Sequence, residues 1–211
     1  MPFYNQSDDH SNFVVGFTPD PKRDFGVFAK GYRLAADRLT AQLFAAPRFS
    51  DYEAYPVVFL YRHALELSLK HIIYASVDLA ALKYLDDLDK GLQNTHDLRK
   101  LSQAATGLLT LLYPEDEFLK QISSVLADTC ADLGSLDARS DAYRYPIDAR
   151  GLRSTDEHTT VNLHAFATRM SPLLEDLDTI HFGLGGERYI AEDAYRIVQE
   201  ALLSASERRA E

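Results

Sequence analysis

The sequence has a single cysteine and no tryptophan. Cys130 cannot form a disulfide within the chain, and its helical-looking surroundings predict a small buried side chain. Residues 1–11 are polar and acidic, without the basic start and apolar run of a signal peptide. No stretch approaches the roughly 18 apolar residues that a membrane-spanning helix needs. Together these absences predict a cytoplasmic protein with no membrane partner.

Several motifs of known chemistry are missing as well. The chain contains no Gly-rich phosphate loop, no G-x-S-x-G turn, no H-E-x-x-H helix and no paired C-x-x-C. His63 and His71 are eight residues apart, which is wider than the spacing of two metal ligands on one helix. We therefore expect neither a metal site nor another cofactor.

An excess of basic residues is also lacking. The chain has 22 lysines and arginines against 32 acidic residues, a formal net charge of -10. A field of that sign repels phosphates and excludes loose nucleic-acid binding over the whole surface. A local basic cleft is still compatible with this charge.

The apolar residues, 46% of the chain, recur mainly with a helical period. This pattern predicts helices over residues 25–46, 50–74, 79–92, 94–112, 114–133, 161–182 and 190–204. The second is apolar nearly all round, which is typical of a central helix with neighbours on several sides. Ser50 and Glu53 form a predicted capping box at its start. Gly183, Gly185 and Gly186 are expected to end the penultimate helix.

Residues 134–157 interrupt this pattern with a polar, aromatic segment that contains glycine and proline. A loop of this length inside a compact domain is usually functional. We expect an all-α antiparallel bundle, with this long polar loop before a late long helix. Residues 1–24 would form an N-terminal arm and residues 25–206 a single helical domain.

Three charged side chains lie at steps of four on the predicted central helix: Arg62, Glu66 and Lys70. This spacing puts them in one stripe of an otherwise apolar helix. One interpretation is a self-neutralising stripe with a solvated edge. The other is that the stripe faces the loop at 137–150 and forms a polar cleft with it, since that loop carries partners of both signs.

The loop also concentrates positive charge. Residues 139–153 contain four arginines and two aspartates, a local charge of +2, with Tyr143 and Tyr145 between them. Arginine beside aromatic side chains suits unstacked bases and phosphate. The same residues would equally dock the loop onto the bundle through ion pairs and ring packing.

Residues 59–70 (FLYRHALELSLK), followed by His96, Asp97 and Leu98, resemble the HEPN superfamily of helical proteins. The later Asp137, Ser140 and the run 143–146 resemble a segment of uncharacterised bacterial members. The resemblance implies an antiparallel bundle that is commonly a homodimer. Many such proteins are metal-independent ribonucleases of toxin–antitoxin, phage-defence or CRISPR systems. Others bind RNA or nucleotides, or act as noncatalytic partners.

In active members of that superfamily, an arginine and a histidine four to six residues apart meet their copies across the dimer. Arg62 and His63 are adjacent here, which departs from that pattern. Arg153 and His158 match the spacing, but they lie in the loop that enters the long helix.

From these patterns we expect binding of RNA or a nucleotide between the central helix and the 137–150 loop. Arg62, Arg139, Arg144 and Tyr145 are the predicted ligand-binding residues; Glu66, Lys70, Asp137 and Ser140 are the predicted supporting residues; His63 or His158 would transfer a proton if RNA is cleaved.

Two other functions fit the same sequence. One is a noncatalytic protein-interaction module, such as an antitoxin or a defence-system subunit with a protein partner. The other is a helical regulator that encloses a small ligand in an apolar pocket along the central helix.

Overall fold

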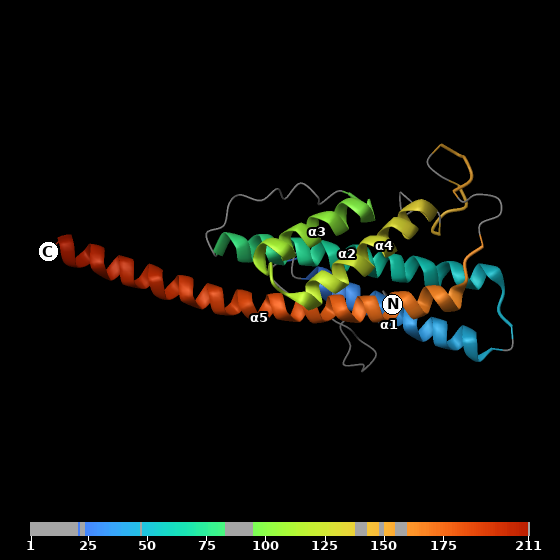
Figure 1. Cartoon of the computed structure of the whole chain (residues 1–211), viewed down its shortest axis with the longest axis horizontal. Coiled ribbons are helices and arrows are strands. Elements are labelled where there is room, and N and C mark those ends of the chain that lie inside the picture. Colours follow the sequence, from blue (N-terminus) through green and yellow to red (C-terminus); the bar gives the residue numbers. More distant parts are fainter. Residues whose placement is uncertain are drawn as a thin grey trace, which may run out of the picture.

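The computed structural model describes Pro21 and residues 24–46, 48–82, 95–137, 143–147, 150–154 and 160–210, with side chains as far as Glu200. These ranges contain the helices α1 (Asp24–Ala45), α2 (Asp51–Leu82), α3 (Leu98–Leu112), α4 (Glu117–Leu136) and α5 (Leu163–Ala210). The helices pack on one another, which confirms the predicted all-α bundle (Figure 1).

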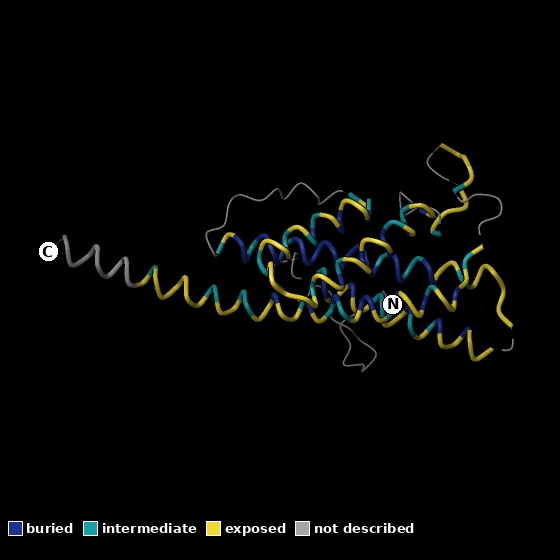
Figure 2. Tube along the Cα trace, in the orientation of Figure 1, coloured by how far each residue is buried: buried dark blue, intermediate teal, exposed yellow. Residues whose placement is uncertain are grey.

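Helix α2 is the centre of the bundle. It contacts α1, α3 and α5, and α4 packs against α3 and α5 (Figure 1). The consecutive pairs α1–α2 and α3–α4 are antiparallel (Figure 1). Buried positions follow α2 around its whole circumference, as the apolar pattern predicts for a central helix (Figure 2). The core joins it to the other helices through Leu65, Leu69, Ile72, Leu101, Leu126, Leu174 and Leu177.

Polar side chains cap the N-terminal ends of three of the helices. At the start of α2, the backbone N–H of Ser50 donates to Glu53 Oε2 at 2.6 Å, which is the returning half of the predicted capping box. Asp97 is the N-cap of α3 and Asp116 the N-cap of α4. Helix α3 therefore begins at Leu98, later than predicted, because the Asp97 carboxylate accepts from the first free N–H groups.

Helix α5 corrects one prediction clearly. Gly183, Gly185 and Gly186 do not end the helix, which continues through them to Ala210 (Figure 1). Each glycine costs a helix only about 1 kcal/mol relative to alanine. Leu184, 2% exposed, packs in the core between them. One turn later, Arg188 binds Asp78 of α2 at 3.0 Å. These tertiary contacts hold the segment helical.

The other element boundaries also shift. Leu79 and Leu82 belong to α2, which runs on to Leu82, and residues 83–94 lie outside the described ranges. Helix α4 includes Gly134 and ends at Leu136. Beyond it, Ile147 and Arg153 form an antiparallel bridge, and Gly151 adopts a φ of 77°. Most of the predicted arm, residues 1–20 and 22–23, lies outside the described residues, and Asp24 begins α1.

Candidate functional site

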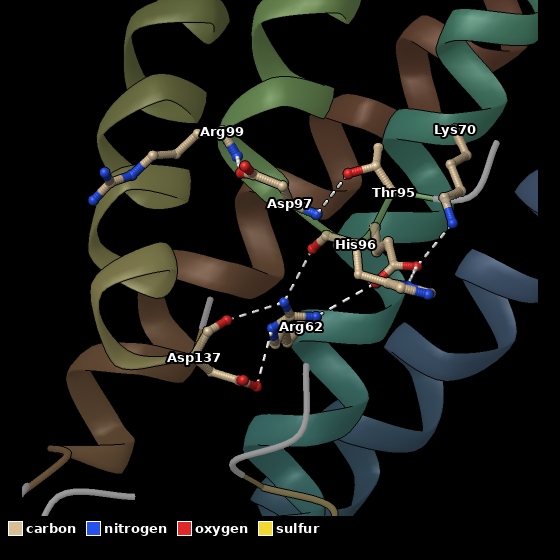
Figure 3. A network of polar contacts seen from close by, with 8 residues as sticks. Arg62, Lys70, Thr95, His96, Asp97, Arg99 and Asp137 are labelled. Carbon is tan, nitrogen blue, oxygen red and sulfur yellow. Dashed lines mark hydrogen bonds and ion pairs between the residues drawn. The ribbon is translucent and has the colours of Figure 1, made fainter. Parts of the chain in front are cut away.

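The predicted stripe of Arg62, Glu66 and Lys70 lies inside the bundle. These residues are 1%, 2% and 7% exposed, so the stripe has no solvated edge. Helix α2 supplies all three at successive turns, and residues at the ends of α3 and α4 complete the group (Figure 3). Buried charges are costly unless they are paired and hydrogen-bonded. The partners of these three side chains therefore decide what the site does.

Arg62 uses its guanidinium to join three elements. Its Nη1 lies 3.4 Å from Glu66 Oε2, and its Nε lies 3.3 Å from Asp137 Oδ2 (Figure 3). Its Nη2 donates to the carbonyl of His96 at 3.3 Å and to the carbonyl of Asp137 at 3.1 Å. The Nε contact is an ion pair without hydrogen-bond geometry. Arg62 thus ties the start of α3 and the end of α4 to the middle of α2.

This geometry changes the role that the sequence suggests for Arg62. A guanidinium that is 1% exposed and directed at carboxylates and carbonyls is not placed to contact a phosphate. We therefore treat Arg62 as a structural residue. Glu66 and Asp137, which we expected to position arginines, both contact its guanidinium.

Glu66 carries a second set of contacts on its other oxygen. Lys70 Nζ lies 3.0 Å from Glu66 Oε1, and His96 Nδ1 lies 2.8 Å from the same atom (Figure 3). Burial raises the pKa of Glu66, but the hydrogen bonds from Lys70 and His96 and their charge outweigh burial and leave the pKa below its ordinary value. The carboxylate is therefore ionised at neutral pH.

His96 is the functional candidate that sequence reasoning missed. Its side chain is 57% exposed, while the Glu66 carboxylate that holds it is buried. The family resemblance includes His96 and Asp97 but gave His96 no role, and Asp97 caps α3. Nothing in the spacing could pair His96 with Glu66, because they are 30 residues apart and meet only when α3 docks on α2.

A row of rings continues along α2 toward its N-terminus; we call it the aromatic strip (Tyr32, Tyr55, Phe59, His63 and Tyr143). Phe59 stacks on His63 with ring centroids 5.5 Å apart and an interplanar angle of 11°. Tyr32 of α1 meets His63 edge-on at 4.6 Å. The ring centroid of Tyr143 lies 6.2 Å from that of Tyr55. The strip ends one helical turn before Glu66.

The loop contributes a cation to the aromatic strip. The guanidinium carbon of Arg144 lies 5.7 Å from the Phe59 ring centroid and 5.1 Å from that of Tyr145, and Arg144 Nη2 donates to the Tyr145 hydroxyl at 3.2 Å. Both side chains are exposed. Burial lowers the pKa of His63; Glu66 opposes this shift and Arg144 adds to it. His63 is consequently neutral at physiological pH.

Some predicted residues are not brought into this site. Arg139, Ser140 and His158 lie outside the described residues, so the Arg153–His158 spacing stays a prediction. His71, one of the two helix histidines, points instead at His181 of α5, with ring centroids 3.7 Å apart. Within the described part of the chain, no three His, Cys, Asp or Glu side chains gather to hold a metal ion.

Comparisons with protein-family models, curated proteins and solved structures found no match to this chain. Among the described residues, no helix is both long enough and apolar enough to span a membrane. Functional inference therefore rests on the geometry of the aromatic strip and of the buried charges beside it.

Proposed function

We propose that this HEPN-like bundle binds single-stranded RNA, or a nucleotide, on the aromatic strip and Arg144. The observation that carries the proposal is the Phe59–His63 stack with the Arg144 guanidinium 5.7 Å from the Phe59 ring. Unstacked bases bind proteins by stacking on aromatic rings and on guanidinium planes. The strip offers both kinds of surface side by side, and the arginine adds a charge for the adjoining phosphate.

The overall charge favours a small, local site. With a net charge of -10, the surface as a whole repels a polyanion. Affinity would come from stacking, at about 1–3 kcal/mol for each base, more than from many phosphate contacts. Short single strands or mononucleotides are therefore the expected ligands, and duplexes, whose bases are already stacked, are not.

RNA cleavage is a second candidate function, favoured by the contact between Glu66 and His96. A buried carboxylate 2.8 Å from Nδ1 of an exposed imidazole holds the ring by that nitrogen and orients it. The other ring nitrogen, Nε2, would accept the proton of an RNA 2′-hydroxyl. The 2′-oxygen then bonds to phosphorus, the bond to the 5′-oxygen breaks, and that oxygen takes a proton from water. The products are a 2′,3′-cyclic phosphate and a 5′-hydroxyl.

In this proposal His96 replaces His63 and His158 as the proton-transfer group. His63 stacks on Phe59, meets Tyr32 edge-on and has a lowered pKa, which suits a stacking surface better than a proton carrier. Lys70 would keep Glu66 ionised while the proton moves.

Binding is tested by fluorescence anisotropy with labelled mixed-sequence RNA oligomers. We expect Arg144→Ala and Phe59→Leu each to weaken binding about tenfold or more, as the loss of one stacking or cationic contact implies. Arg169→Ala is the matched control. Arg169 is also exposed, but it pairs with Asp132 and lies outside the aromatic strip. Unchanged affinity in both strip variants would refute the proposal.

Cleavage is tested separately with His96→Gln and Glu66→Gln in the presence of EDTA. Both variants should lose the cyclic-phosphate product, and an RNA with a single 2′-deoxy sugar at the cut should resist the wild-type protein. His96→Gln should still bind RNA, because His96 lies outside the aromatic strip. A wild-type protein that binds but never cleaves would leave the binding proposal standing and remove the catalytic one.

A noncatalytic protein-interaction module is the alternative function. The contacts of Arg62 with Glu66, Asp137 and two backbone carbonyls favour it, because a buried arginine with such partners behaves as a support for the bundle. In that case Arg144→Ala would lower the melting temperature by loosening the loop, and RNA binding would be absent from the start.

A further inference from the structure

Helix α5 continues past the point where its neighbour α1 begins. Arg33 of α1 binds Asp178 of α5 at 2.9 Å. Nearer the start of α1, Gly26 packs against the His181 ring, so the two helices run antiparallel. Helix α1 begins two residues before Gly26, at Asp24, whereas α5 runs on well beyond this point (Figure 1). The residues that precede α1 are therefore next in line along α5.

The side of α5 that faces α1 carries two exposed aromatic side chains beyond His181. Phe182 is 86% exposed and Tyr189 is 75% exposed. Phe182 lies about one helical turn after Asp178, and Tyr189 lies about three turns after it. Both are thus on the side of α5 on which Asp178 meets α1. We call Phe182 and Tyr189 together the α5 patch.

The chain that precedes α1 contains an apolar run of matching character. Residues 13–17 (FVVGF) include four large apolar side chains and no charge. Residues 18–23 connect this run to α1, and six residues span up to about 20 Å. Tyr189 lies only about 12 Å beyond His181 along the helix axis, at about 1.5 Å per residue. The apolar run is therefore long enough, and close enough in the chain, to reach the α5 patch.

We infer that residues 13–17 dock on the α5 patch of the same chain. The docked segment covers the side of α5 that α1 leaves open where it begins. This inference is independent of RNA binding, since neither the segment nor the α5 patch belongs to the aromatic strip.

The size of the α5 patch favours a segment of the same chain over a separate molecule. A covered aromatic side chain buries about 150–250 Å², so the two exposed rings offer about 300 Å². A separate protein in a standard interface covers about 800 Å² on each side. A tethered segment needs less area, because a short linker holds it at an effective concentration of about millimolar. Residues 13–17 meet that condition through their connection to α1.

Tryptophan fluorescence of the full chain tests the inference, because the natural sequence contains no tryptophan. In Tyr189→Trp, the introduced indole is the only one and reports whether the α5 patch is covered. We expect it to emit at shorter wavelength than the indole of Leu111→Trp, and to be quenched severalfold less by acrylamide. Leu111 is the matched control position, since it is 49% exposed on α3.

A change in the docking segment then separates its contribution from that of the helices. Adding Phe13→Ser and Phe17→Ser to the Tyr189→Trp chain should move its emission to longer wavelength and raise quenching severalfold. Adding Asn5→Ser and Gln6→Ser, outside the apolar run, should change neither. Circular dichroism should show the same helix content in all these chains.

Hydrogen exchange gives a second measurement in chains that keep the natural α5. Phe13→Ser with Phe17→Ser should speed exchange severalfold in peptides that cover residues 182–198 and leave α3 unchanged, because α5 loses a packing partner there. Emission and exchange that do not respond to the change at Phe13 and Phe17 would overturn the inference. So would a blue-shifted emission that appears only at high protein concentration, because a second copy would then be the cover.

Discussion

Arg62 is the residue whose loss should cost this bundle the most stability. It balances the buried carboxylates of Glu66 and Asp137 and satisfies two backbone carbonyls at helix ends. Removing one member of a buried charge group leaves the others unpaired, at a cost of about 3–5 kcal/mol. We expect Arg62→Ala to lower the free energy of unfolding by about that amount, measured by urea denaturation.

A control separates this role from a general effect of losing an arginine. Arg169 pairs with Asp132 at the surface, with both side chains well exposed, and such pairs contribute less than about 1 kcal/mol. Arg169→Ala should therefore be nearly neutral. Equal losses in the two variants would show that the buried network is not specially important to stability.

His71 and His181 should make the protein sensitive to acid. His71 is buried, and its Nδ1 has no hydrogen-bond partner. Its ring centroid lies 3.7 Å from that of His181. Asp178, Lys30 and Arg188 are the charged groups that act on the pair. Burial, with the positive charges of His181 and Arg188 acting in the same direction, lowers the pKa of His71 to about 3. Burial also lowers the pKa of His181.

The direction of the pH dependence follows from these shifts. Above pH 6.5 both histidines are neutral in the folded and unfolded chain, so they impose no penalty. Below pH 6.5 the unfolded chain binds protons that the folded chain excludes, and stability falls as the pH approaches 3. Between pH 7 and pH 5 His71 alone should account for about 2 kcal/mol. Urea denaturation of His71→Gln should show a smaller loss over this interval, whereas the exposed His164→Gln should match wild type.

At the scale of elements, the glycines of α5 are positions where stability can be gained. A Cβ built on Gly185 meets no atom within 4 Å, and the residue is exposed and helical. Alanine restricts the unfolded chain and suits a helix better, by about 0.5–1 kcal/mol. We expect Gly185→Ala to raise the melting temperature by a few degrees, measured by circular dichroism.

Gly26 in α1 should behave in the opposite way. A Cβ there would lie 1.8 Å from Cε1 of His181, so the α1–α5 contact would have to open. Overpacking of this kind costs about 1–3 kcal/mol. A Gly26→Ala variant as stable as Gly185→Ala would contradict the close contact between Gly26 and the His181 ring.

At the scale of the whole molecule, the number of phosphates that the protein neutralises sets how RNA affinity depends on salt. Each phosphate neutralised on a single strand contributes a slope of about -0.7 to log K against log salt. A site built on stacking with Arg144 as its cation should contact one to three phosphates, which gives a slope between about -0.7 and -2. Anisotropy titrations at several KCl concentrations measure it. A slope much steeper than -2 would mean that binding is spread over a basic surface that the aromatic strip does not represent.

Most of the helical segments were predictable from the sequence, because helical periodicity is a local pattern. The period of the apolar residues predicts α1 and α2, and Ser50 with Glu53 marks the start of α2. The steps of four between Arg62, Glu66 and Lys70 placed these charges on one face of α2. Whether that face met solvent, a loop or the core depended on where other helices docked.

The sequence by itself determined an all-helical bundle around an apolar central helix, because helical periodicity and caps act within a few residues. Only the tertiary structure decided that α5 continues through its glycines, that Arg62 is enclosed by Asp137, and that Glu66 holds His96. Each of these depends on contacts between residues remote in the chain: Leu184 enters the core, and the start of α3 and the end of α4 meet Arg62 of α2. Packing energy from such contacts exceeds local propensity, and no local pattern records it.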